Sequence, residues 1–156
     1  MRVLAPYAEN PRSRPAVPRA VFVALLSLLA TAASAGVTIS ELKGVARVRR
    51  PNTVSWNEVP AHYVLAPGDE LKTDRGAKAT LLFDDGSRVE VGPNSSYLLE
   101  ESEAGKSSMS LSFGKLRAWV TKATARRFAV RTPTAVCSVR GTEFGVDVGR
   151  DGATKV

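Results

Sequence analysis

Few side chains in this sequence have the chemistry of catalysts or metal ligands. The chain contains one cysteine, Cys137, and one histidine, His62. No disulfide can therefore form within the chain, and a catalytic thiol would have a single histidine to act as its base. Val136 and Val139 flank Cys137, which favours a buried, small apolar residue over a reactive thiol.

The carboxylates lie beside predicted turns and not in catalytic or metal-binding patterns. The run Asp84-Asp85-Gly86 has no histidine or cysteine nearby and is typical of a tight turn. The glutamates at positions 100, 101 and 103 precede a second turn at residues 104–106, which argues against a glycosidase pair. The chain also lacks a Gly-X-Ser-X-Gly elbow, a His-Glu-X-X-His motif and a glycine-rich phosphate loop. The sequence therefore predicts a protein that is not an enzyme and that uses no cofactor or metal ion.

Positive charge is moderate and dispersed. The whole chain has a formal net charge of +7, of which the first 35 residues supply +3 through four arginines and one glutamate, leaving +4 on the remainder. The remaining basic residues alternate with acidic ones and form no stripe with interleaved aromatic side chains, as nucleic-acid recognition requires. We therefore exclude nucleic acid as a partner.

The first 35 residues have the order of a secretory signal peptide. Four arginines lie in the basic leader, no charged residue occurs between Ala20 and Ala35, and Ala33-Ser34-Ala35 supplies small residues for cleavage before Gly36. The uncharged run is shorter than the roughly 20 apolar residues that span a bilayer. The sequence predicts a signal peptide at residues 1–35 and a periplasmic or secreted protein, with membrane attachment only if the leader is retained.

After Gly36, apolar and polar side chains alternate with a period of two. This alternation over residues 80–83, 88–91, 108–113 and 116–121 predicts half-buried antiparallel strands. Turn residues, including Gly114, separate these runs, and no later stretch has the apolar spacing of a helix. Residues 36–156 are predicted to be one all-β domain, an antiparallel β-sandwich or short β-coil of about ten to twelve short strands linked by tight turns.

Two short segments near the end of the chain are the most distinctive motifs in the sequence. Arg131-Thr132-Pro133-Thr134-Ala135-Val136 is followed closely by Val139-Arg140-Gly141-Thr142-Glu143-Phe144. Together with Gly68-Asp69 and Asp85-Gly86, in this order and spacing, they resemble the FecR domain, an all-β module of bacterial cell envelopes. The resemblance extends from about Gly44 to the end of the chain and supports the all-β prediction.

We expect the residues that carry this resemblance to be mainly structural. They are Gly68, Asp69, Asp85, Gly86, Thr132, Pro133, Thr134, Ala135, Arg140, Gly141, Thr142 and Phe144. Arg140 is expected to be a partly buried guanidinium that bonds strand-end carbonyls or a carboxylate such as Asp69 or Asp85. Gly114 and Gly141 are expected to allow a bulge or a close approach of two backbones.

The resemblance implies a role in envelope signalling through a protein partner. The best-known FecR-like domains lie on the periplasmic side of a membrane-spanning regulator and pass a signal from an outer-membrane transporter to a sigma factor. Only 19 residues precede the apolar run here, and the chain stops soon after the second motif, so we do not extend sigma-factor control to it. The last expected strand, residues 153–156, is short. This points to a truncated reading frame or to a sheet edge that a partner completes.

A glycan of the cell wall or envelope is the alternative ligand. Trp56, Tyr63, Tyr97 and Trp119 are candidates for a sugar-binding surface. Trp119 is out of phase with the apolar positions of its strand, so we expect its ring to lie on the exposed face.

The signal-peptide prediction can be tested on the exported protein itself. We expect mass spectrometry of material recovered from the envelope to identify Gly36 as the N-terminal residue. An intact Met1, or an N-terminus that lies within the apolar run, would show that the leader is not cleaved as predicted.

Overall fold

The structure, a computed structural model, describes residues 36–103, 105–122, 127–139 and 143–156. The described residues form thirteen β-strands and no helix, which confirms the all-β prediction with slightly more strands than expected. The strands are β1 (Val37–Lys43), β2 (Ala46–Arg49), β3 (Asn57–Glu58), β4 (Val64–Leu65), β5 (Glu70–Thr73), β6 (Lys78–Leu82), β7 (Arg88–Val91), β8 (Ser96–Glu103), β9 (Lys106–Trp119), β10 (Arg127–Arg131), β11 (Val136–Val139), β12 (Glu143–Val148) and β13 (Thr154–Lys155). No helix long and apolar enough to span a membrane occurs within these ranges.

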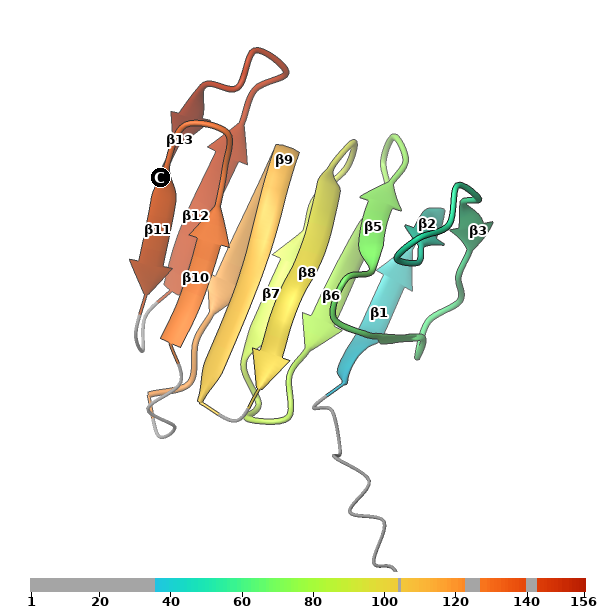
Figure 1. Ribbon diagram of the computed structural model, residues 1–156, viewed down its shortest axis with the longest axis horizontal. Coiled ribbons are helices and arrows are strands. Elements are labelled where there is room, and N and C mark those ends of the chain that lie inside the picture. The colour runs from blue at the N-terminus through green and yellow to red at the C-terminus, as the bar shows by residue number, and fades with distance from the viewer. Residues whose placement is uncertain (1–35, 104, 123–126, 140–142) are drawn as a thin grey trace, which may run out of the picture. The chain divides into compact units, whose positions relative to one another are not determined.

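The strands form one curled sheet whose two halves share β9 (Figure 1). One half, sheet A, has the order β4-β1-β6-β7-β9-β12-β13, and the other, sheet B, has the order β3-β2-β5-β8-β9-β10-β11. Neighbouring strands are antiparallel except for β9 and β10, which run parallel. Among the described strands, β3, β4, β11 and β13 therefore have a neighbour on one side only.

The long strand β9 passes from sheet B into sheet A at Gly114. Before this residue it pairs with β8 and β10, and from Gly114 onward it pairs with β7 and β12. Its buried apolar residues change phase at the same point, from Met109 and Leu111 to Leu116 and Ala118. The prediction that Gly114 is a turn between two strands is therefore wrong.

Gly114 allows this passage because any residue with a side chain would be strained in its backbone conformation. Its φ angle is 106°, and a Cβ atom there would lie 2.1 Å from Ser95 Oγ and 2.5 Å from Ser95 Cα. The Ser95 hydroxyl fills the space and accepts a hydrogen bond of 3.0 Å from the Lys115 N–H. The expected close approach of two backbones at Gly114 is confirmed.

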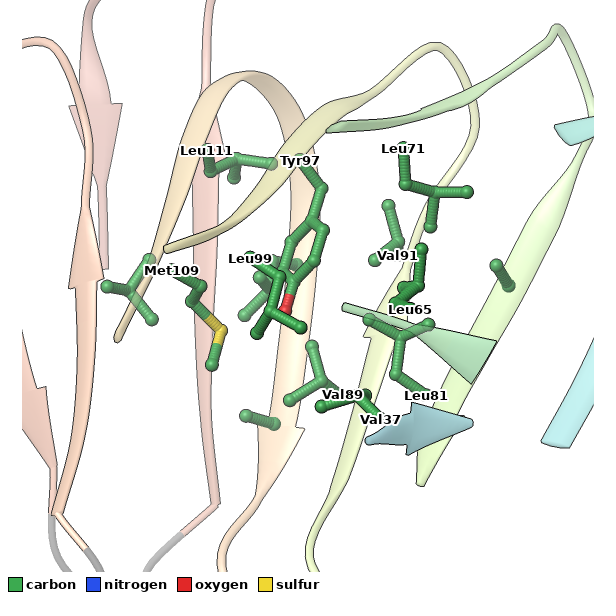
Figure 2. Close-up of a cluster of buried hydrophobic side chains, with 14 of the residues drawn as sticks. Val37, Leu65, Leu71, Leu81, Val89, Val91, Tyr97, Leu99, Met109 and Leu111 are labelled. Atoms are coloured by element: carbon green, nitrogen blue, oxygen red, sulfur yellow. The ribbon is translucent and has the colours of Figure 1, made fainter. Parts of the chain in front are cut away.

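The inner faces of the two halves share one apolar core (Figure 2). Side chains of sheet A, such as Val37, Leu81 and Val89, belong to the same buried cluster as side chains of sheet B, such as Leu71 and Leu99. The alternation that predicted these strands results from this arrangement, because every second residue faces the core.

One ion pair and ring packing hold the parallel strand β10 in place. Glu100 on β8 accepts hydrogen bonds from Ser108 and Ser110 on β9, and its Oε2 lies 3.3 Å from Nε of Arg131 on β10. Burial by itself raises the pKa of Glu100, but the two hydroxyls and the Arg131 charge lower it overall. On the inner side, the rings of Phe128 and Phe83 pack edge to face with centroids 5.0 Å apart.

A comparison of two glycine variants can separate the effect of the close contact at Gly114 from the cost in stability that any side chain has at a positive φ angle. Gly105 also has a positive φ, 86°, but a Cβ there would meet nothing within 4 Å. We expect Gly105→Ala to lower the free energy of unfolding by about 1–2 kcal/mol, and Gly114→Ala to lower it by at least about 3 kcal/mol because overlap with Ser95 is added. Urea unfolding monitored by circular dichroism measures both. Equal losses in the two variants would contradict the close approach.

Candidate functional site

The motif residues Gly68 and Asp69 form the turn that leads into β5. The Asp69 carboxylate accepts a hydrogen bond of 3.0 Å from the Ala66 N–H, and the Asp69 carbonyl accepts one of 3.1 Å from the Leu99 N–H on β8. Gly68 packs against Pro51, whose Cγ would lie 2.6 Å from a Cβ at this position. Because Asp69 is 3% exposed and bonded to backbone on both sides, it stabilises the fold and is not open to a ligand.

Asp85 and Gly86 close the β6–β7 hairpin and attach it to the end of β9. The Gly86 N–H donates to the Phe83 carbonyl, and Asp85 accepts hydrogen bonds from both the N–H and the hydroxyl of Ser87, each 2.9 Å long. The fully buried Ser87 hydroxyl accepts a further bond of 3.0 Å from the Thr121 N–H, just beyond β9. This turn therefore fixes the position of the residues that follow Trp119.

Thr132, Pro133, Thr134 and Ala135 form the β10–β11 turn and bind the β12–β13 hairpin through hydroxyl groups. The Thr132 and Thr134 hydroxyls each lie 2.8 Å from the Thr154 hydroxyl. The Thr134 hydroxyl also donates to the Gly152 carbonyl, 3.0 Å away. This hydroxyl cluster (Thr132, Thr134 and Thr154) joins the end of sheet B to the end of sheet A. Sequence reasoning did not identify Thr154, because its partners are about twenty positions away in the chain.

The other motif residues are only partly described. Phe144 lies on β12, half-buried, and packs against the core. Arg140, Gly141 and Thr142 lie outside the described residues, so the expected pairing of Arg140 with Asp69 or Asp85 stays a prediction. Cys137 is half-buried on β11 and not fully buried as expected.

Trp119 lies on the outer face of sheet A, as its phase predicted. It is 36% exposed and is the fourth residue in a row of directly paired residues across five strands. This outer row consists of Thr38, Leu82, Arg88, Trp119 and Glu143. A second row beside it contains Glu41, Thr80, Glu90, Arg117 and Gly145.

A hollow of about 750 Å³ lies over these rows. This Trp119 hollow is lined by Ser40, Glu41, Thr80, Leu82, Gly86, Arg88, Glu90, Trp119, Val120 and Thr121. Glu90 is paired with Lys78, with Nζ and Oε2 2.6 Å apart. Arg88 and Glu41 make no ion pair within the described part of the chain. The hollow thus presents a free cation, a free carboxylate and an indole ring on one face.

The other candidate aromatic residues do not join Trp119. Trp56 contacts two cations of sheet B, with Arg49 Cζ 5.0 Å and Lys72 Nζ 4.1 Å from its ring centroid. Tyr63 packs partly against the core.

Tyr97 is fully buried among core side chains (Figure 2), and its hydroxyl has no hydrogen-bond partner among the described residues. This burial raises the pKa of Tyr97, because the charged phenolate is disfavoured there. The idea that Tyr97 lines a sugar-binding surface is therefore wrong. Its strand has an irregular register between Ser96 and Tyr97, which the sequence does not reveal.

In the described ranges, no group of three or more histidine, cysteine, aspartate or glutamate side chains could hold a metal ion.

Comparison with known proteins identifies one family. The family described as "FecR protein" matches residues 69–156, which is more than half of the chain and includes both late motifs as well as Asp85 and Gly86. No curated protein and no solved structure matches the chain.

The hydroxyl cluster leads to a stability prediction. Thr154→Val keeps the shape of the side chain but removes the group that both Thr132 and Thr134 contact, so we expect a loss of about 1–2 kcal/mol in the free energy of unfolding. Amide exchange in β12 and β13 should also become faster. Thr38→Val is the matched control, because the Thr38 hydroxyl has no hydrogen bond within the described residues. Equal stability of the two variants would contradict the role assigned to Thr154.

Proposed function

Because this chain belongs to the FecR protein family, we propose that it is an exported, non-enzymatic domain that acts in envelope signalling by docking another protein. Membership of the family supports a signalling or sensing role at the cell envelope. Export and the docking mode are finer parts of the proposal, and each has separate support.

The position of the first strand supports export with removal of a signal peptide. Cleavage before Gly36 would leave β1 complete, since this strand begins at Val37. Val37 and Ile39 are fully buried in the core, and cleavage before Gly36 would keep both in the mature protein. Residues 1–35 would then serve for targeting, and residues 36–156 would be the mature protein in the periplasm or outside the cell.

The edge strand β11 is the observation that carries the docking proposal. Its sequence Val-Cys-Ser-Val is uncharged and free of proline, whereas β3, β4 and β13 are each two residues long. Proteins usually protect exposed strand edges with charge, proline or short length. Val136 is 64% exposed, so β11 combines an exposed apolar side chain with an edge that lacks both charge and proline and is twice as long as the other three.

The pairing of β10 with β11 determines which backbone groups face outward. The Thr132 N–H donates to the Ala135 carbonyl at the turn, and hydrogen-bonded pairs alternate along an antiparallel ladder. The N–H and C=O groups of Val136 and Ser138 are therefore directed away from β10. A partner that presents an extended segment could add a strand there by β-augmentation. The sequence had suggested the last strand as the open edge, but β11 is longer than that strand, β13. In addition, Thr154 on β13 already binds the β10–β11 turn.

The proposal can be tested with variants of the edge that leave the core intact. We expect the mature protein to capture a specific envelope protein by affinity purification after cross-linking. Ser138→Pro should reduce this capture at least tenfold, because proline removes an outward N–H, and Val136→Lys should do the same by placing a charge on the edge.

Val64→Lys is the matched control. Val64 is 56% exposed on the edge strand β4 of the other half, so this change adds the same charge at a similar site away from β11. Capture should be unchanged in this variant, and circular dichroism should show that all three variants fold. Equal capture by folded Ser138→Pro and wild-type protein would refute docking through β11.

A further inference from the structure

The indole ring of Trp119 is available to a ligand, unlike that of Trp56. Arg49 and Lys72 lie over the Trp56 ring at 5.0 Å and 4.1 Å, whereas the Arg117 guanidinium is 6.0 Å from the ring centroid of Trp119. The hollow that Trp119 lines has a volume of about 750 Å³, which is within the range of small-ligand sites. The ring therefore offers a flat apolar surface at the margin of a ligand-sized space.

The charges that line the hollow favour a neutral ligand. Lys78 neutralises Glu90, and the remaining charges, those of Arg88 and Glu41, are of opposite sign. A phosphate or a polyanion would gain from Arg88 but would be repelled by Glu41. The arginine supplies only donors and the carboxylate only acceptors, and hydroxyl groups can satisfy both because each one donates and accepts.

A second apolar contact lies across the hollow from Trp119. Leu82 is 38% exposed and belongs to the same outer row, with β7 between its strand and that of Trp119. Two strand spacings separate the two side chains by about 10 Å. Arg88 lies between them in the row. Across β9, β7 and β6 the row therefore presents an aromatic ring (Trp119), a hydrogen-bond donor (Arg88) and a small apolar patch (Leu82).

We propose that the Trp119 hollow binds a glycan of N-acetylated amino sugars. The apolar face of one pyranose ring stacks on Trp119, and Arg88 and Glu41 bond the hydroxyl and amide groups. Leu82 contacts the methyl group of an acetamido substituent. This site lies on the outer face of sheet A and is separate from the β11 edge, so one domain can hold wall glycan and a protein partner independently.

The test uses the mature protein and chitotetraose, a soluble chain of four N-acetylglucosamine units. We expect calorimetric titration to give saturable binding, with a dissociation constant that rises at least tenfold in Trp119→Ala, because the stacking surface is lost. Trp119→Phe should retain most of the affinity, since a ring remains. Arg88→Gln should weaken binding about tenfold, because it removes the charged donor.

Trp56→Ala is the matched control, since it removes the other tryptophan from the opposite half of the sheet. It should bind chitotetraose like the wild-type protein. Val136→Lys should also bind the sugar normally, and Trp119→Ala should still capture the protein partner, so the two proposals fail separately. No binding by the wild-type protein at about 10 mM sugar, or equal binding by folded Trp119→Ala, would overturn the glycan site.

Discussion

The passage of β9 between the two halves of the sheet is the constraint on which the rest of the structure depends. One continuous strand supplies the centre of both sheet A and sheet B, so neither half can shift along the other without breaking its ladder. The bend requires a residue without a Cβ atom, because Ser95 occupies the space where one would lie. Gly114 thereby fixes the phase in which Trp119 points outward and Ala118 inward.

The turns that carry the family motifs maintain this arrangement at its margins. Asp69 ties the turn before β5 to β8, Ser87 ties the β6–β7 turn to the end of β9, and the hydroxyl cluster joins the two late hairpins. These contacts are between hydroxyls, carboxylates and backbone groups within the domain. The described motif residues therefore stabilise the fold, and the two surfaces that we propose for binding, the outer row around Trp119 and the edge strand β11, lie next to them.

Local patterns in the sequence predicted much of the fold and part of the candidate site. The alternation of Leu81 with Thr80 and the outward phase of Trp119 both follow from the two-residue period of a strand, and the structure confirms them. Gly114 was misinterpreted because a glycine between two apolar runs has the same local pattern in a turn and in a bent strand. Tyr97 was misplaced because an irregular register puts Ser96 and Tyr97 both in buried positions.

By itself, the sequence determined the class of fold, most of the turn positions and the side of β9 on which Trp119 lies, since these depend on residues close together in the chain. Only the tertiary structure decided which distant residues meet. It covers the Trp56 ring with Arg49 and Lys72, places Thr154 against Thr132, and leaves β11 at an open edge. These outcomes depend on strand order and register across the sheet, and a two-residue period is compatible with many orders and registers.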